Sequence, residues 1–255
     1  MKIYYVMETR GRRCHIRTAL GVDAKSWNRF HRRVREWRRQ LEQRYGTLAA
    51  DRLVPGGPLS GTHQFRLSCD CGCHAGSALP QEAALVAQAL RVVEDFAVET
   101  GGVQVVNVCL DLDEAPAYRR VALDRLFNRI NATADRENDY AILIFGQEPE
   151  ENVVRTYERL RSRNPVPVRA DAAGDGWHTR NLPINRIIGS PVFRDPGTDW
   201  LLQVAGLVAR ALLWQEEPPG VAAGIDAENH AAFSVLDCAL NRRASRRDPQ
   251  GVVRR

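Results

Sequence analysis

Soft metal ligands are concentrated in one short stretch of the sequence. Cys69, Cys71, Cys73 and His74 stand at alternate or adjacent positions, with His63 upstream. Zinc knuckles and ribbons separate paired ligands by about two residues, and ligands spaced as closely as these surround a tetrahedral ion only when distant ligands join them. Three interpretations stay open: a zinc site, a local or intermolecular disulfide, and reduced thiols in a surface loop. The last is the default in a cytosolic chain.

A pair of carboxylates stands at the end of an apolar, β-prone run. Asp111 and Asp113 follow residues 103–110. Alternate residues of a strand share a face, so the pair could hold a single divalent metal if the strand continues that far. The alternative is a helix N-terminus enriched in acids, which the helix dipole favours.

Arginines gather on one predicted helix. Ser26 is a suitable N-cap, and the apolar residues from Trp27 to Tyr45 recur three and four positions apart. Residues 25–45 hold eight basic and two acidic side chains. The face opposite the apolar residues carries Arg29, Arg32, Arg33, Arg35, Arg38, Arg39 and Arg44. This face is a solvated helix surface, a surface that contacts nucleic-acid phosphates, or a surface for an acidic protein partner.

The elements that would position these residues alternate between strands and helices. Strands are predicted at 2–7, 14–21, 103–110 and 141–145, and helices at 26–45, 81–100, 118–130, 150–163 and 199–214. The last helix is apolar on nearly every face, interrupted by Gln203 and Gly206, which predicts a buried central position. This alternation is typical of an α/β fold with a mixed sheet flanked by helices.

The domain organisation follows from the remaining stretches. Residues 1–240 are predicted to form one domain, with an irregular Gly- and Cys-rich excursion at 46–79. Residues 241–255 contain six arginines and one aspartate, and we expect a basic, unstructured tail that contacts nucleic acid or an acidic partner.

Composition limits the class of protein. The chain is 44% hydrophobic, which suffices for a large core, yet it has no apolar run long enough to span a membrane and no signal-peptide pattern. We therefore expect a cytoplasmic protein without a membrane partner. The net charge of +5 equals that of the last fifteen residues, so residues 1–240 are neutral overall. The overall charge is thus a weak indication of nucleic-acid binding.

Two C-terminal segments carry a family resemblance. Residues 187–196 (IIGSPVFRDP) and 201–212 (LLQVAGLVARAL) resemble, without a gap, the closing motif of the bacterial "domain of unknown function 3800" group of RNase H-like proteins. The resemblance extends more loosely over residues 1–217. It implies a single RNase H-like domain. In an active member, carboxylates hold two divalent metal ions for nucleic-acid cleavage.

This chain departs from the family at the metal-binding positions. The resemblance places carboxylates at three positions that are occupied here by Met7, Gly146 and Gly206. The thioether of methionine does not bind magnesium, and glycine has no side chain that could. The residual acids are Glu8, Asp51, Asp111 and Asp113, and Glu8 points to the opposite strand face from residue 7.

The resemblance therefore predicts a pseudo-nuclease that needs no cofactor. It would act as an accessory or scaffold subunit of a bacterial phage-defence or mobile-element system. Its partners would be other protein subunits, or DNA or RNA contacted through residues 25–45 and the tail. The alternative is a nuclease dependent on Mg²⁺ or Mn²⁺ that uses the residual acids in a rearranged site.

Overall fold

The main sheet is mixed and has five strands. The computed structural model describes residues 1–45, 78–113, 117–146, 150–169, 177–218 and 231–254. Its strands are β1 (Lys2–Arg10), β2 (Cys14–Asp23), β3 (Val103–Asp111), β4 (Ala141–Phe145) and β7 (Val192–Phe193). The order is β3-β2-β1-β4-β7; β1 and β3 are antiparallel to β2, whereas β4 is parallel to β1 and β7. This is an RNase H-like sheet, and the predicted α/β class is confirmed.

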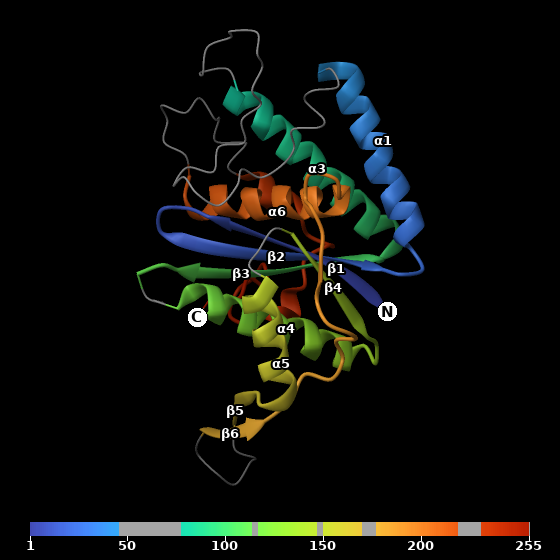
Figure 1. Ribbon diagram of the computed structural model, residues 1–255. Helices are drawn as coiled ribbons and strands as arrows, with labels where there is room; N and C mark the ends of the chain where they lie inside the picture. The colour runs from blue at the N-terminus through green and yellow to red at the C-terminus, as the bar shows by residue number, and fades with distance from the viewer. Residues whose placement is uncertain (46–77, 114–116, 147–149, 170–176, 219–230, 255) are drawn as a thin grey trace.

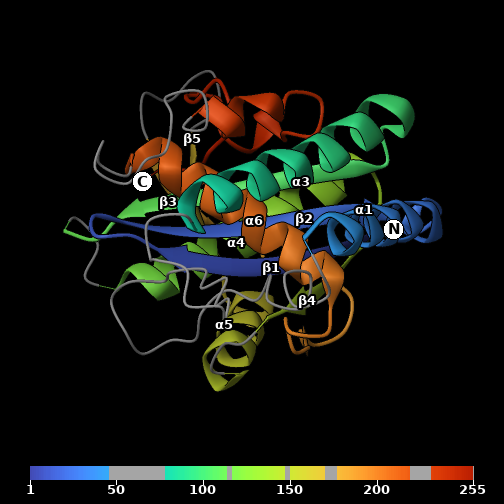
Figure 2. The same cartoon turned by 90° about the horizontal axis from the view of Figure 1, so that it is seen from above.

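Helices cover both faces of this sheet (Figures 1 and 2). One face carries α1 (Trp27–Tyr45), α3 (Ala78–Thr100) and α6 (Trp200–Glu216). The other carries α4 (Tyr118–Arg136) and α5 (Glu150–Ser162). Two apolar clusters result, one on each side of the sheet. The helix predicted to be buried is confirmed, because α6 packs on β1 and β2 and its side chains from Leu201 to Ala209 are buried.

The alternation of side chains assigns residues to the two faces. On β1, Tyr5 and Met7 belong to the cluster beneath α6, whereas Tyr4 and Val6 belong to the cluster against α4 and α5. Because successive strand residues point to opposite faces, Glu8 joins the α4 side. This assignment decides which functional residues can meet.

Three features fall outside the predicted elements, and the first is the two-residue edge strand β7. A separate ribbon of β5 (Pro165–Arg169) and β6 (Trp177–Asn181) extends away from the main sheet beyond α5 (Figure 1). Short 3-10 turns lie at Ala231–Val235 and Arg242–Ala244.

None of the helices that the structure describes has the length and apolarity to cross a bilayer.

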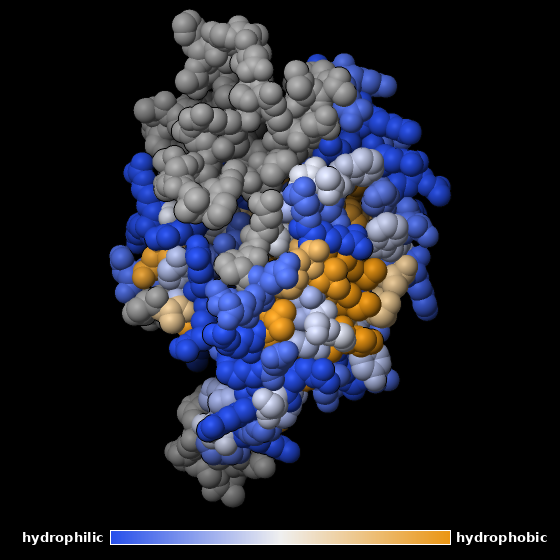
Figure 3. Space-filling view, in the orientation of Figure 1, coloured by the Kyte–Doolittle hydropathy of each residue, from blue (hydrophilic) through white to orange (hydrophobic). Residues whose placement is uncertain are grey.

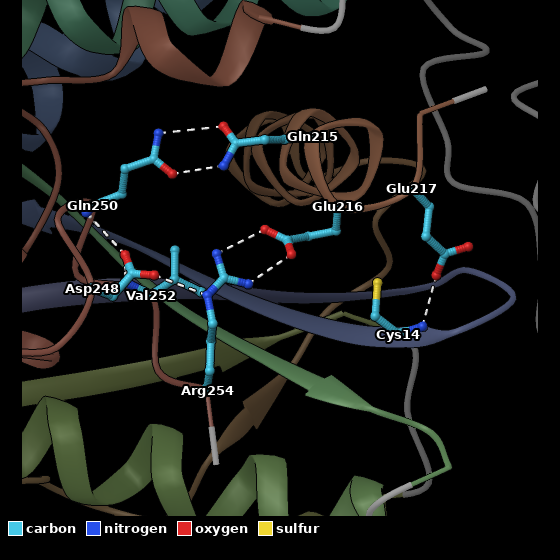
Figure 4. Close-up of polar contacts among 8 residues, drawn as sticks. All are labelled: Cys14, Gln215, Glu216, Glu217, Asp248, Gln250, Val252 and Arg254. Carbon is cyan, nitrogen blue, oxygen red and sulfur yellow. Dashed lines mark hydrogen bonds and ion pairs between the residues drawn. The ribbon is translucent and has the colours of Figure 1, made fainter. Parts of the chain in front are cut away.

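The C-terminal segment is ordered, and the prediction of an unstructured tail at 241–255 is wrong for residues 241–254. Val252 and Val253 are buried, and the Val253 amide and carbonyl hydrogen-bond with Asn107 and Cys109 of β3. In Figure 4 the Arg254 guanidinium donates two hydrogen bonds to Glu216, at 2.7 and 2.8 Å, and a third to Asp248. The segment therefore covers the β3 edge, which would otherwise expose unpaired backbone groups.

Candidate functional site

Met7 and Gly146, the two strand positions where the resemblance places carboxylates, lie beside each other. The parallel register ends with Val6 opposite Phe145, and the Gly146 amide donates to the Val6 carbonyl at 3.1 Å. A Cβ atom added at Gly146 would collide with the Met7 sulfur and lie 3.1 Å from Cγ of Pro196. Met7 is 6% exposed and belongs to the core cluster. An apolar thioether therefore fills the space beside residue 146, where any side chain would displace it.

The third such position, Gly206, is buried within α6 on the same side of the sheet as Met7. One turn earlier, Gln203 donates hydrogen bonds to the carbonyls of Pro196 and Gly197 and accepts one from Arg38. Arg38 is only 4% exposed, so the prediction that it lies on the solvent face of α1 is wrong. A buried guanidinium is accommodated here because the amide oxygen and the Trp200 ring, 5.1 Å away, receive it.

The residual acids do not form a shared site in the described chain. Glu8 lies on the α4 face and accepts a hydrogen bond from Arg17 at 2.9 Å. Asp111 ends β3 on the opposite face, the one that Met7 occupies. Residues paired across strands share a face, and Met7 pairs with Thr18, which pairs with Asn107. Asp111 follows Asn107 by four residues and therefore lies on the same face as Asn107. Its Oδ1 atom accepts from the amide of Asp113, which lies beyond the strand in a turn.

A wider search for metal ligands gives the same result for the part of the chain that is described. There, no three His, Cys, Asp or Glu side chains converge as they would around a metal ion. Asp51 and the Cys69, Cys71, Cys73 and His74 group lie outside the described residues.

The arginines of α1 fall into two sets. Arg29 and Arg33 pair with Glu99 of α3, at 3.1 and 2.7 Å, and their guanidinium groups lie over the Phe96 ring. Arg32, Arg35 and Arg39 are exposed and form no ion pair with any residue that the structure describes. The outer surface of α1 is hydrophilic in Figure 3. We call these three residues the free arginine face; the other two stabilise the contact of α1 with α3.

Two buried thiols lie close together on the helix α6 side of the sheet. Cys14 and Cys109 are free cysteines on neighbouring strands. A hydrogen bond with Cys109, burial and the nearby Glu217 carboxylate raise the pKa of Cys14. The Cys14 thiol therefore stays protonated and is a poor nucleophile.

Sequence reasoning missed a polar cluster on the other face. His15 and Arg17 of β2 are each 1% exposed, and Arg17 donates to Glu8. Burial lowers the pKa of His15 to about 3, assisted by Arg17, Arg119 and Arg10. The available signal was two basic residue types, His15 and Arg17, at alternate positions of a mostly apolar strand, because buried polar and charged groups require partners.

Comparison with known proteins adds no relative: no family model, no curated protein and no solved structure matches the chain.

Proposed function

We propose that this chain is a catalytically inactive RNase H-like protein that binds nucleic acid as an accessory or scaffold subunit of a bacterial defence or mobile-element system. The observation that supports it is the contact between Met7 and Gly146. A two-metal nuclease needs carboxylate oxygens at converging strand ends. Here the two adjacent strand ends carry a buried thioether and a glycine that leaves room for it.

The free arginine face supports nucleic acid as the ligand. Arg32, Arg35 and Arg39 are three and four residues apart, so they project from one side of α1. The helix beneath them is held by buried apolar residues, among them Phe30, Val34, Trp37 and Leu41. Guanidinium groups without carboxylate partners among the described residues suit phosphate oxygens, and a helix held by its buried face presents them without an added cost of ordering the backbone.

The test is the salt dependence of binding to labelled single- and double-stranded DNA and RNA, followed by fluorescence anisotropy. Replacing Arg32, Arg35 and Arg39 by glutamine should lower affinity and reduce the slope of log K against log salt by about 2 to 3, since each lost phosphate contact contributes roughly 0.7 to 0.9. The matched control replaces Arg161, Arg163 and Arg180, three exposed arginines in or beside α5 and β6, with the same loss of charge. An equal loss in both variants would contradict a localised interface.

The inactivity is tested separately. We expect no cleavage of any of these substrates with Mg²⁺ or Mn²⁺. Metal-dependent cleavage that disappears in an Asp111→Asn variant would establish the alternative, a nuclease with a rearranged carboxylate site.

A protein-binding role is the second candidate. Ile188 and Val192, at the β7 edge of the sheet, are 46% and 43% exposed. Figure 3 shows an apolar patch on the surface of the molecule. Failure of the chain to bind any nucleic acid at low salt would favour this role over the first.

A further inference from the structure

The end of the β1–β2 hairpin meets the first turn of α4. Arg10 of β1 pairs with His15 of β2, and the His15 ring lies 4.9 Å from the ring of Tyr118, the first residue of α4. The guanidinium carbons of Arg10 and Arg119 lie 5.4 and 5.9 Å from the centre of that tyrosine ring. We call Arg10, His15, Tyr118 and Arg119 the hairpin–helix cluster.

His15 has unused hydrogen-bonding capacity. The residue is 1% exposed, and neither Nδ1 nor Nε2 has a hydrogen-bond partner within the described chain. Glu8 Oε2 lies 3.7 Å from Nε2, beyond hydrogen-bond distance, and already accepts from Arg17 at 2.9 Å. Buried polar atoms are almost always paired, so two unpaired ring nitrogens indicate a missing partner.

The surroundings of His15 indicate that this partner is an anion. Arg17, Arg119 and Arg10 all act electrostatically on the ring, and neither Arg10 nor Arg119 forms an ion pair with any carboxylate that the structure describes. The N-terminus of α4 adds to this positive potential, because Ala117 provides no side-chain cap for the first amides of a 19-residue helix.

We propose that the hairpin–helix cluster binds the phosphate group of a phosphorylated ligand. Arg10 and Arg119 are exposed and reach it as paired guanidinium donors, and the first amides of α4, which the Ala117 side chain does not cap, add further donors at this end of the helix. His15 is neutral, because its pKa is about 3, and therefore has one ring N–H to donate. Free phosphate, a mononucleotide and the phosphorylated end of a nucleic acid share this chemistry.

This site goes beyond the proposed function. The cluster lies on the α4 face of the sheet, whereas the free arginine face belongs to α1 on the other side (Figure 1). The five-stranded sheet separates the two, so each can be tested without the other.

The experiment is calorimetric titration of the full chain with inorganic phosphate at constant ionic strength. The test variant is Arg10→Gln/Arg119→Gln. The control is Arg12→Gln/Arg120→Gln, which removes the same charge from exposed neighbours on the same two segments. We expect saturable binding by the wild type, a loss of about tenfold or more in the test variant and a change within about twofold in the control. Phosphate should also shift the NMR signals of the His15 ring nitrogens.

Further titrations identify the source of the phosphate. Tighter binding of adenosine monophosphate than of inorganic phosphate supports a nucleotide. Preference for a 5′-phosphorylated over a 5′-hydroxyl oligonucleotide supports a nucleic-acid end.

Two results would overturn the inference. One is the absence of saturable binding to both phosphate and adenosine monophosphate. The other is an equal loss in the control variant, because that indicates diffuse electrostatic attraction. The variant of Arg32, Arg35 and Arg39 should leave phosphate binding unchanged. If the chain fails to bind phosphate but still binds nucleic acid, the result contradicts the phosphate site at the hairpin–helix cluster. It does not contradict the nucleic-acid interface on α1.

Discussion

Replacing His15 by glutamine should remove part of the loss of stability that acid causes. In the folded protein, burial lowers the pKa of His15 from 6.5 to about 3, assisted by Arg17, Arg119 and Arg10, while Glu8 is occupied by Arg17. Below about pH 6.5, His15 therefore binds a proton in the unfolded chain but not in the folded chain. The stability linked to His15 is complete above pH 6.5 and is lost as the pH falls toward 3.

The magnitude follows from this difference. Each pKa unit corresponds to about 1.4 kcal/mol, so protonation of the unfolded chain alone removes about 2 kcal/mol of unfolding free energy between pH 8 and pH 5. The result is insensitive to the folded value, because any folded pKa well below 5 gives nearly the same loss. It is a sizeable fraction of the total stability of a typical domain.

The assay is equilibrium urea unfolding at pH 8 and pH 5, at one ionic strength, with tryptophan fluorescence as the signal. Between pH 8 and pH 5 the free energy of unfolding should fall by about 2 kcal/mol more in the wild type than in His15→Gln. This difference does not depend on how the substitution changes stability at pH 8. His178→Gln, at an exposed position on β6, is the control and should behave as the wild type. Equal losses in wild type and His15→Gln would refute the argument, since His15 would then be protonated in the folded state.

Three further predictions follow from the contacts described. Gly146→Ala should destabilise the protein by about 1 to 3 kcal/mol, because the added Cβ meets the Met7 sulfur. The same substitution should cost less in a Met7→Ala background. A double-mutant cycle measured by denaturation that shows no coupling between the two positions would contradict the contact. Calorimetry with Mn²⁺ should detect no saturable binding in the wild type or in Asp111→Asn; binding abolished by the substitution would reveal a rebuilt metal site. Arg254→Ala should lower stability by about 1 kcal/mol, less at high salt, because its bonds to Glu216 are partly exposed; a thermal melt unaffected by salt would argue against an ionic role.

Local pattern was sufficient for most regular elements. The apolar runs predicted β1, β2, β3 and β4 with starts that agree with the structure, because strands that are buried on both faces require consecutive apolar residues. The 118–130 helix was predicted too short, since its last turns to Arg136 are mostly polar and rest on tertiary packing. The β5–β6 ribbon was missed because Pro165 and Pro167 have no backbone N–H and argue against a strand, and because residues 178–181 of β6 are exposed and polar.

The presence of arginines was a poor predictor of which segments are exposed. Arg38 is buried although it stands among exposed arginines, because its position on α1 faces α6 and Gln203 receives it. The C-terminal segment was predicted to be unstructured from its arginines, yet Val252 and Val253 are inserted against β3. Two valines are too few to produce a periodicity, but they suffice to cover a strand edge.

The sequence by itself determined the α/β class, the central position of α6 and the identity of the residues at 7, 146 and 206, because these depend on local periodicity and residue type. Only the tertiary structure decided that Met7 fills the space beside Gly146, that Glu8 and Asp111 point to opposite faces, and that His15 lies unpaired among arginines. These relations join strands and helices that are distant along the chain. Local propensity carries no information about which of them will meet.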